Sequence, residues 1–275
     1  MGAQWTGDGP QWRGAVLTTA SRLGSTSIAR LRAEILAAGA ILVRVPVAAE
    51  PDRTGSAAFA LVGAAIGCVA ALALILVGTV APTAGPIAAL AVFALASGGL
   101  HLDGLADTAD ALAAPSIEMA EVARRDPRAG PAGVVAIVLV LTIDWAVLLD
   151  VLDGQGLAFA AAAVVIAAAV SRAVGALAPS LATQPFRPGF GQWFAERTTR
   201  LDGAVALGTA LCVAAVMSVA VGRPVVLIAA VGGFACGIAV VMALGRLRRG
   251  LDGDALGAII ELTLAATLFV VAVFA

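Results

Sequence analysis

Seven long apolar stretches run through this sequence and restrict what it can fold into. In chain order they are Ala57–Val80, Gly85–Leu100, Pro131–Leu149, Leu157–Leu177, Ala204–Val221, Val225–Leu244 and Leu256–Ala275. A helix needs about 20 apolar residues, within a range of about 17–25, to cross the hydrocarbon core of a bilayer. The second stretch is short by this measure, and the residues after it can complete it near the headgroups. We therefore predict an all-α, polytopic transmembrane bundle of about seven spans.

The composition also points to lipid as the solvent of this chain. Hydrophobic residues make up 61% of the 275 residues and charged residues only 13%, whereas soluble domains carry about half and about a quarter. The 31 glycines favour close approach of transmembrane helices. The net charge of -1 selects no charged partner, and we expect no nucleic acid partner. A water-soluble globule is excluded, because the polar surface is too small to cover one.

The N-terminal part differs from the rest. Residues 1–33 are polar, rich in arginine and without the apolar core of a signal peptide, so we predict a loose tail. The stretch Ile35–Val47 contains Arg44 and Pro46, which favours a short interfacial or re-entrant helix over a full span. Residues 34–275 are predicted to form a single transmembrane domain.

The arginines indicate the orientation of the spans. With the N-terminus placed in the cytoplasm, segments 101–130, 178–203 and 245–255 all lie inside and carry most of the arginines outside the N-terminal region. Only Arg223 falls in an outer turn. Because cytoplasmic loops carry an excess of basic residues, we predict a multi-pass membrane protein with these three segments in the cytoplasm.

Three aspartates follow the second apolar stretch at helical spacing. Asp103, Asp107 and Asp110 fall within an arc of about 60° if the segment is helical. Carboxylates so arranged repel one another unless cations lie between them, and hard oxygen ligands suit Mg²⁺. The alternative is a solvated acidic face at a helix end. The sole histidine, His101, precedes the stripe, and base, metal ligand and hydrogen-bond donor all remain open for it.

Two further acidic positions open the last apolar stretch. Asp254 and Glu261 lie seven residues apart on one predicted helix face, and Asp252 or Asp254 is a candidate N-cap. Glu261 falls about two turns into an apolar span, where an acid is a functional-site hypothesis by default. Asp144 also lies in an apolar stretch, and the sequence offers no account of it.

Basic residues could bind phosphate near these acids. Arg125 and Arg128, with Gly130 and Gly133, lie in the loop after the aspartate stripe, where arginine forks suit phosphate oxygens. The alternative is that these arginines only mark the cytoplasmic side. For Arg172, near the predicted inner end of its span, the alternative is that the side chain extends to the interface.

Ordered blocks of this sequence resemble the cobalamin synthase family, the adenosylcobinamide-GDP ribazoletransferases. The first and longest block is Gly98–Asp110, with His101-Leu-Asp103-Gly-Leu-Ala-Asp107-Thr-Ala-Asp110 at its centre. The others are Arg44-Val-Pro46, Phe59–Gly63, Arg125–Gly133, Ser171-Arg172 and Gly253–Glu261. The resemblance covers roughly residues 40–275.

The resemblance implies a Mg²⁺-dependent membrane transferase that completes the nucleotide loop of cobalamin. Its substrates would be adenosylcobinamide-GDP and α-ribazole or α-ribazole 5′-phosphate, and its products adenosylcobalamin or its 5′-phosphate and GMP. A ribazole hydroxyl would attack the phosphate nearer cobinamide. The candidate catalytic residues are His101, Asp107, Arg125, Asp126, Arg128 and Glu261. The candidate substrate-binding residues are Arg44, Gly130, Gly133, Ser171 and Arg172. The candidate metal ligands are Asp103, Asp107, Asp110, Asp254 and Glu261.

Other functions fit parts of the pattern. A CDP-alcohol phosphotransferase or a prenyltransferase would also handle diphosphates with spaced aspartates and Mg²⁺. An ion-coupled transporter would use Glu261 and Asp144 as proton sites, although transporters place such acids at the midplane. The oligomeric state stays open, with a homo-oligomer as one alternative.

Overall fold

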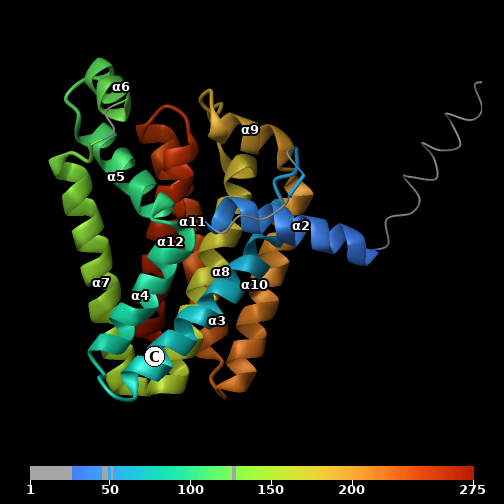
Figure 1. The fold of residues 1–275 in the computed structure, drawn as a ribbon, viewed down its shortest axis with the longest axis vertical. Helices are drawn as coiled ribbons and strands as arrows, with labels where there is room; N and C mark the ends of the chain where they lie inside the picture. The colour runs from blue at the N-terminus through green and yellow to red at the C-terminus, as the bar shows by residue number, and fades with distance from the viewer. Residues whose placement is uncertain (1–26, 45–48, 51, 126–127) are drawn as a thin grey trace, which may run out of the picture.

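The computed structural model describes residues 27–44, 49–50, 52–125 and 128–275, and every regular element in these ranges is helical. The elements are α2 (Ser27–Leu42), the 3-10 turn η1 (Ser56–Ala58), α3 (Phe59–Gly78), α4 (Ala84–Ser97), α5 (Leu100–Ala113), α6 (Ile117–Arg125), α7 (Pro131–Gln155), α8 (Leu157–Leu181), α9 (Phe190–Arg197), α10 (Arg200–Ala220), α11 (Val225–Leu247) and α12 (Gly253–Phe274). Figure 1 shows one bundle with α6 and α9 at one end, called here the α6–α9 end. The α3–α4 and α7–α8 connections lie at the opposite end. The predicted all-α fold is confirmed.

Six helices are long and apolar enough to cross a membrane by themselves, counting the described residues. They span Ser56–Gly78, Pro131–Gln155, Leu157–Leu181, Arg200–Ala220, Val225–Leu247 and Gly253–Phe274. Helices α4 and α5 are long and apolar enough only when taken together. Counting that pair as one broken span gives seven spans. The chain is therefore a multi-pass membrane protein, with about the number of spans that the apolar stretches predict.

The second span is broken, which its short apolar stretch did not predict. Helices α4 and α5 meet at 88°, and the two residues between them, Gly98 and Gly99, have φ values of 61° and 80°. Glycine adopts this left-handed region without the steric cost that a Cβ imposes. The turn directs α5 toward the α6–α9 end (Figure 1).

Helix α8 forms the centre of the bundle. Nearly every side chain from Phe159 to Ala178 is buried, and α3, α10, α11 and α12 all pack against it. Its many alanines allow this close packing, and α3 matches them with small residues of its own. A Cβ added at Gly63 of α3 would lie 2.6 Å from the carbonyl oxygen of Ala168. Polar side chains on α8 are therefore enclosed by protein.

Local signals fix the starts of three long helices. Pro131 occupies the first turn of α7, a position where its missing N–H costs nothing. A capping box between Thr199 and Asp202 starts α10. The Asp252 carboxylate accepts a hydrogen bond from the Ala255 N–H and caps α12, which settles the predicted choice between Asp252 and Asp254.

Helix α2 differs from the prediction for the N-terminal part. It begins at Ser27, so residues 27–33 of the predicted tail are helical, and it ends at Leu42. No helix breaker occurs between Ser27 and Glu34, and several good helix formers do. The second half packs on the bundle through buried Ala37, Ala38 and Leu42. The rest of the predicted tail and residues 45–48 lie outside the described residues.

Candidate active site

The aspartate stripe lies where α5 packs against α12. Helix α5 carries Asp103, Asp107 and Asp110 at the predicted helical spacing. A Cβ added at Gly104 would lie 2.6 Å from the carbonyl oxygen of Asp254, so the two backbones touch there. A Cβ added at Gly257, one turn along α12, would lie 3.2 Å from the backbone of His101. These two glycines bring the first turn of α12 directly against the stripe.

The carboxylates at this contact repel one another. The charge on Asp107 is opposed by Asp103, Asp254 and Asp110, and that on Asp254 by Asp252 and Asp103. Four of the predicted metal ligands, from two separate helices, are thus close enough to repel at least one other member of the group. A bound cation would relieve this repulsion.

Asp110 has a structural role that the sequence did not reveal. Its carboxylate accepts hydrogen bonds from the N–H groups of Gly130, at 2.7 Å, and Gly133, at 2.9 Å. These donors belong to the start of α7, where unpaired N–H groups favour a negative charge. A Cβ at either glycine would lie 2.5 Å from an Asp110 oxygen, so both glycines admit this carboxylate. Asp110 therefore caps α7 from twenty residues away.

The predicted ligand Glu261 lies deeper in the bundle with a different group of residues. Its Oε1 lies 3.8 Å from Nδ1 of His101, and both side chains are buried. Arg172 donates to Ser171 Oγ at 3.0 Å, stands over the ring of Phe93, and interacts electrostatically with Glu261. Arg172 is 1% exposed, so its side chain does not reach the interface and the alternative of interfacial extension is wrong.

Asp144 of α7 joins this buried group. It is 1% exposed, and neither carboxylate oxygen has a hydrogen-bond partner among the described residues. Asp144 and Glu261 line a cavity of about 10 Å³, which is close to the room that one water needs. The sequence shows only that Asp144 is an acidic residue inside an apolar span. The fold shows that its side chain faces Glu261.

The predicted arginine block falls partly outside the described part of the chain. Asp126 is not described, nor is the side chain of Arg125, so neither prediction can be compared with the structure. Arg128 is exposed. Arg44 lies at the α4–α5 break, where its N–H donates to Ala96 and its side chain covers Gly98.

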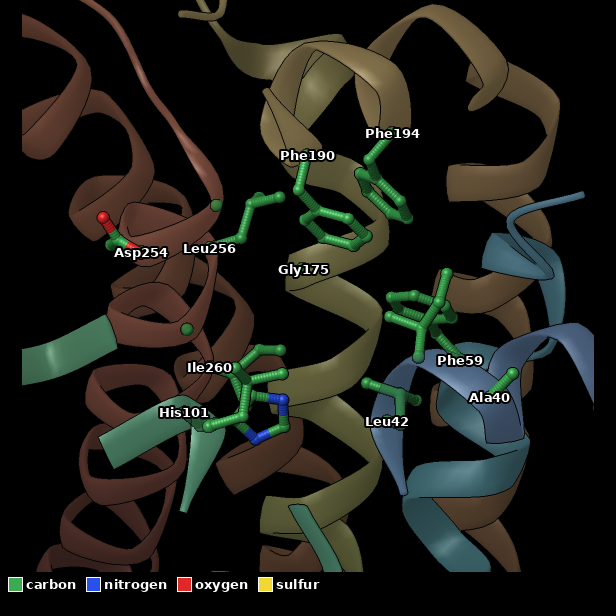
Figure 2. Close-up of a pocket in the computed structure, with 14 residues that line it drawn as sticks. Ala40, Leu42, Phe59, His101, Gly175, Phe190, Phe194, Asp254, Leu256 and Ile260 are labelled. Carbon is green, nitrogen blue, oxygen red and sulfur yellow. The ribbon is translucent and has the colours of Figure 1, made fainter. Parts of the chain in front are cut away.

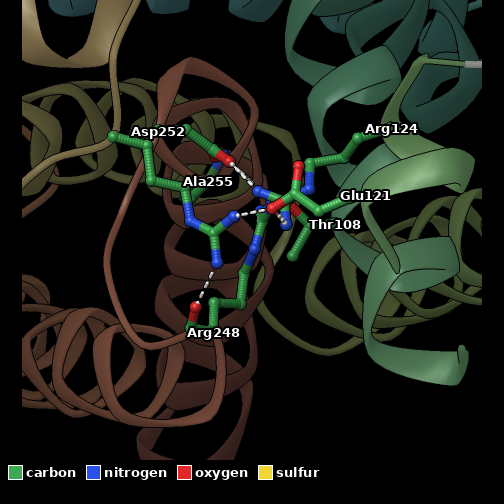
Figure 3. A network of polar contacts seen from close by, with 7 residues as sticks. Thr108, Glu121, Arg124, Arg248, Asp252 and Ala255 are labelled. Carbon is green, nitrogen blue, oxygen red and sulfur yellow. Dashed lines mark hydrogen bonds and ion pairs between the residues drawn. The ribbon is translucent and has the colours of Figure 1, made fainter. Parts of the chain in front are cut away.

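Other arginines, which were not among the candidate site residues, form a network beside the stripe (Figure 3). Arg248 is buried, and its Nη1 donates to Thr108 Oγ1 at 2.7 Å. Arg248 and Arg124 share the Asp252 carboxylate, at 2.7 and 3.1 Å. Burial lowers the pKa of the Arg248 guanidinium, and the Asp252 carboxylate opposes that shift. These partners are up to 140 residues apart in sequence, so no local pattern could have revealed them.

An apolar cavity of about 340 Å³ is lined by residues from the first turns of α5 and α12 (Figure 2). Phe59, Phe190 and Phe194 form one wall and stack on one another, with ring centroids 5.4 and 6.1 Å apart. His101 and Asp254 belong to the opposite wall. A substrate in this cavity would therefore contact the aromatic rings and His101, whereas the Asp254 carboxylate points away from the cavity (Figure 2).

The donor set fits Mg²⁺ in part. No group of three or more His, Cys, Asp or Glu side chains is preassembled for a metal ion in the described ranges. Magnesium in proteins is usually held by one or two carboxylates, with water and substrate phosphates completing the shell. The repelling carboxylates of Asp103, Asp107 and Asp254 offer hard oxygens of this kind.

Comparison with known proteins gives one consistent family. The sequence profile described as CobS, cobalamin-5-phosphate synthase, matches residues 34–272. An adenosylcobinamide-GDP ribazoletransferase of Pseudomonas fluorescens is 32% identical over 238 residues, which cover 84% of this chain and 94% of that protein. One of Thiobacillus denitrificans is 35% identical over 224 residues, covering 79% and 81%. No solved structure matches significantly. The match over nearly the whole described bundle shows that the chain belongs to the CobS family of cobalamin-5-phosphate synthases.

Proposed function

We propose that the chain transfers the cobinamide-phosphate group of adenosylcobinamide-GDP to α-ribazole or its 5′-phosphate. The products are adenosylcobalamin or its 5′-phosphate and GMP, so this is the last step of nucleotide-loop assembly. The names of the relatives support the reaction and both substrates. The observation that carries the proposal is the meeting of Asp103 and Asp107 with Asp254 across the α5–α12 contact. Family membership decides against the phosphotransferase, prenyltransferase and transporter alternatives.

The proposed cofactor is Mg²⁺, held by Asp103, Asp107 and Asp254 together with the diphosphate of the substrate. When bound, it supplies positive charge to the diphosphate oxygens during transfer. Asp110 and Glu261 are less suited to this set than predicted, because Asp110 caps α7 and Glu261 pairs with His101.

The remaining residues position the reactants and take up the proton. The acceptor enters from the apolar cavity, because His101 lines it beside the acidic site. His101 takes the proton of the ribazole hydroxyl, and Glu261 at 3.8 Å stabilises the charge that His101 gains. The hydroxyl oxygen bonds to the phosphorus nearer cobinamide. The bond from that phosphorus to the bridging oxygen breaks, and GMP leaves with its electron pair.

The site is proposed to face the cytoplasm of a bacterium. Arg124 at the end of α6, Arg187 before α9 and Arg248 after α11 belong to segments at the α6–α9 end, toward which α5 runs (Figure 1). Loops rich in arginine stay on the cytoplasmic side of bacterial membranes. The water-soluble substrates would reach the site from that side.

Product analysis of the purified protein tests the function. The wild type should convert adenosylcobinamide-GDP and α-ribazole to adenosylcobalamin and GMP in the presence of Mg²⁺, as followed by mass spectrometry. Asp107→Asn should lower the rate by about 100-fold or more, because it removes a charge from the metal site. Absence of GMP from the wild-type reaction would refute the function. Unchanged turnover and Mg²⁺ dependence in Asp107→Asn would refute the assignment of Asp107.

A further inference from the structure

Four arginines line a second pocket, of about 250 Å³, toward the α6–α9 end of the bundle. They are Arg124 of α6, Arg187 from the loop before α9, and Arg248 and Arg249 from the loop after α11. No carboxylate belongs to its wall among the described residues. We propose that this arginine pocket binds the phosphate of the guanosine nucleotide, the group that leaves as GMP. The proposal rests on the proposed function, and it assigns a binding site to the nucleotide part of adenosylcobinamide-GDP.

The guanidinium groups are held in position before any ligand arrives (Figure 3). Glu121 accepts from Arg124 at 2.8 Å and from Arg187 at 2.5 Å, and Asp252 accepts from Arg124 and Arg248. Arg187 also donates to the backbone carbonyl of Arg248 at 2.7 Å. The buried Nε atoms of Arg124 and Arg248 have no hydrogen-bond partner in the described part of the chain. Guanidinium forks fixed in this way suit phosphate oxygens.

A purely structural explanation covers only part of this arrangement. Arginines after α11 would stabilise the negative end of its helix dipole and keep the loop on the cytoplasmic side. Arg124 and Arg187 come from other segments, and that explanation gives no reason for them to converge on the same pocket. Glu121 and Asp252 offset only part of the charge of the four guanidinium groups, and a bound anion would offset the rest.

Arg249 is the member of the pocket whose conformation is hardest to explain structurally. Its φ of 53° makes it the sole non-glycine residue at positive φ within the described ranges. It is exposed and has no ion-pair partner among them. Helices commonly end on a glycine in this conformation, so an arginine there keeps a strain that glycine would remove. Binding of an anion gives the guanidinium a function that accounts for that strain.

The arginine pocket adjoins the acidic site through Arg248. The same guanidinium donates to Thr108, the residue after Asp107, and attracts the carboxylates of Asp107 and Asp254. A diphosphate with one phosphoryl group at the carboxylates would therefore place its other one at Arg248 and the arginine pocket. The nucleotide would lie in a different pocket from the acceptor, because the arginine pocket and the apolar cavity share no lining residue.

Titration of GMP into the purified full-length protein, by calorimetry in detergent, tests the pocket. Arg249→Gly should raise the Kd for GMP about tenfold, the loss expected for one charge-assisted contact. Its Tm should be unchanged or higher, because glycine adopts the positive φ without strain. Arg246→Ala is the matched control, since Arg246 is exposed in the last turn of α11 but does not line the pocket. It should leave the Kd unchanged.

Two further measurements distinguish a nucleotide phosphate from a lipid headgroup as the ligand, and failure of the pocket assignment from failure of the proposed reaction. Inorganic pyrophosphate should compete with GMP, whereas dihexanoyl phosphatidylglycerol should not. Competition by the lipid with no GMP binding would overturn the assignment in favour of a headgroup site. A wild-type protein that releases GMP from adenosylcobinamide-GDP, with unchanged GMP affinity in Arg249→Gly, would refute the pocket alone. Arg249-dependent GMP binding without turnover would uphold the pocket and refute the transfer reaction.

Discussion

The three aspartates on one face of α5 do not share one role. The Asp110 carboxylate accepts hydrogen bonds from the N–H groups of Gly130 and Gly133. Asp107 has no such donors in the described structure, and three neighbouring carboxylates repel it. A carboxylate whose hydrogen bonds are made within the fold stabilises the protein. A carboxylate that faces only like charges is available to bind a cation. This difference separates the cap from the proposed metal site.

Asp110→Ala is predicted to destabilise the protein. The substitution leaves the N–H groups of Gly130 and Gly133 without their acceptor, which should lower the free energy of unfolding by about 1–3 kcal/mol. Equilibrium denaturation in detergent micelles measures the change. A stability equal to that of the wild type would contradict the cap, and Asp110→Asn, which keeps one acceptor oxygen, should lose less.

Asp144→Leu is predicted to have the opposite effect on stability. It replaces a buried carboxylate that has no hydrogen-bond partner in the described structure with a somewhat larger apolar side chain of the same branched shape. Removing that desolvation cost should raise the free energy of unfolding by about 1–3 kcal/mol. Leu148→Ala, one turn further along α7 and fully buried, should instead lower it by about 2–5 kcal/mol. A loss of stability in Asp144→Leu would show that Asp144 has a partner in the protein.

Two contacts between helices build the site. Gly63 and Gly67 allow α3 to pack closely against α8. Gly104 and Gly257 allow α5 to pack closely against α12. The second contact is the one that carries the acidic residues, because α5 leaves α4 at 88° and carries its aspartates toward Asp254. The break at Gly98 is therefore as necessary to the acidic site as the aspartates themselves.

Gly104→Ala tests the α5–α12 contact. Its Cβ would lie 2.6 Å from the Asp254 carbonyl oxygen, so the helices must separate and the carboxylates must move apart. GMP release should fall by about 100-fold, as small displacements of catalytic groups can cost that much. Gly208→Ala on α10, where a Cβ meets nothing within 4 Å, should keep full activity. Normal activity in Gly104→Ala would show that this packing does not set the site.

Local sequence patterns predicted the helices well and their long-range partners poorly. Hydropathy located the spans because each span must satisfy its own backbone in lipid. The spacing of Asp103 and Asp107 predicted one helix face because helical periodicity is local. The pairing of Asp110 with Gly130, and of Arg248 with Thr108, depends on how distant helices pack. The burial of Arg172 was missed for the same reason, since the sequence does not show that α8 is central.

At the scale of the molecule, the bundle separates two ends of different character. The α6–α9 end gathers the acidic site and the arginine network, and the other end carries the short connections (Figure 1). Thiol labelling of single-cysteine variants in bacterial cells checks the proposed orientation, once Cys68, Cys212 and Cys236 are replaced. Ser116→Cys, before α6, should react with a membrane-impermeant reagent only in inside-out vesicles, and Thr83→Cys, between α3 and α4, only in intact cells. The reverse pattern would place the active site outside.

A double-mutant cycle on GMP release tests most directly whether α5 and α12 contribute to one site. The rates to compare are those of the wild type, Asp107→Asn, Asp254→Asn and the double variant, at saturating Mg²⁺. If both carboxylates hold the same metal, either single change should abolish most of the activity and the double change should cost little more. Independent effects that multiply in the double variant would contradict a shared site.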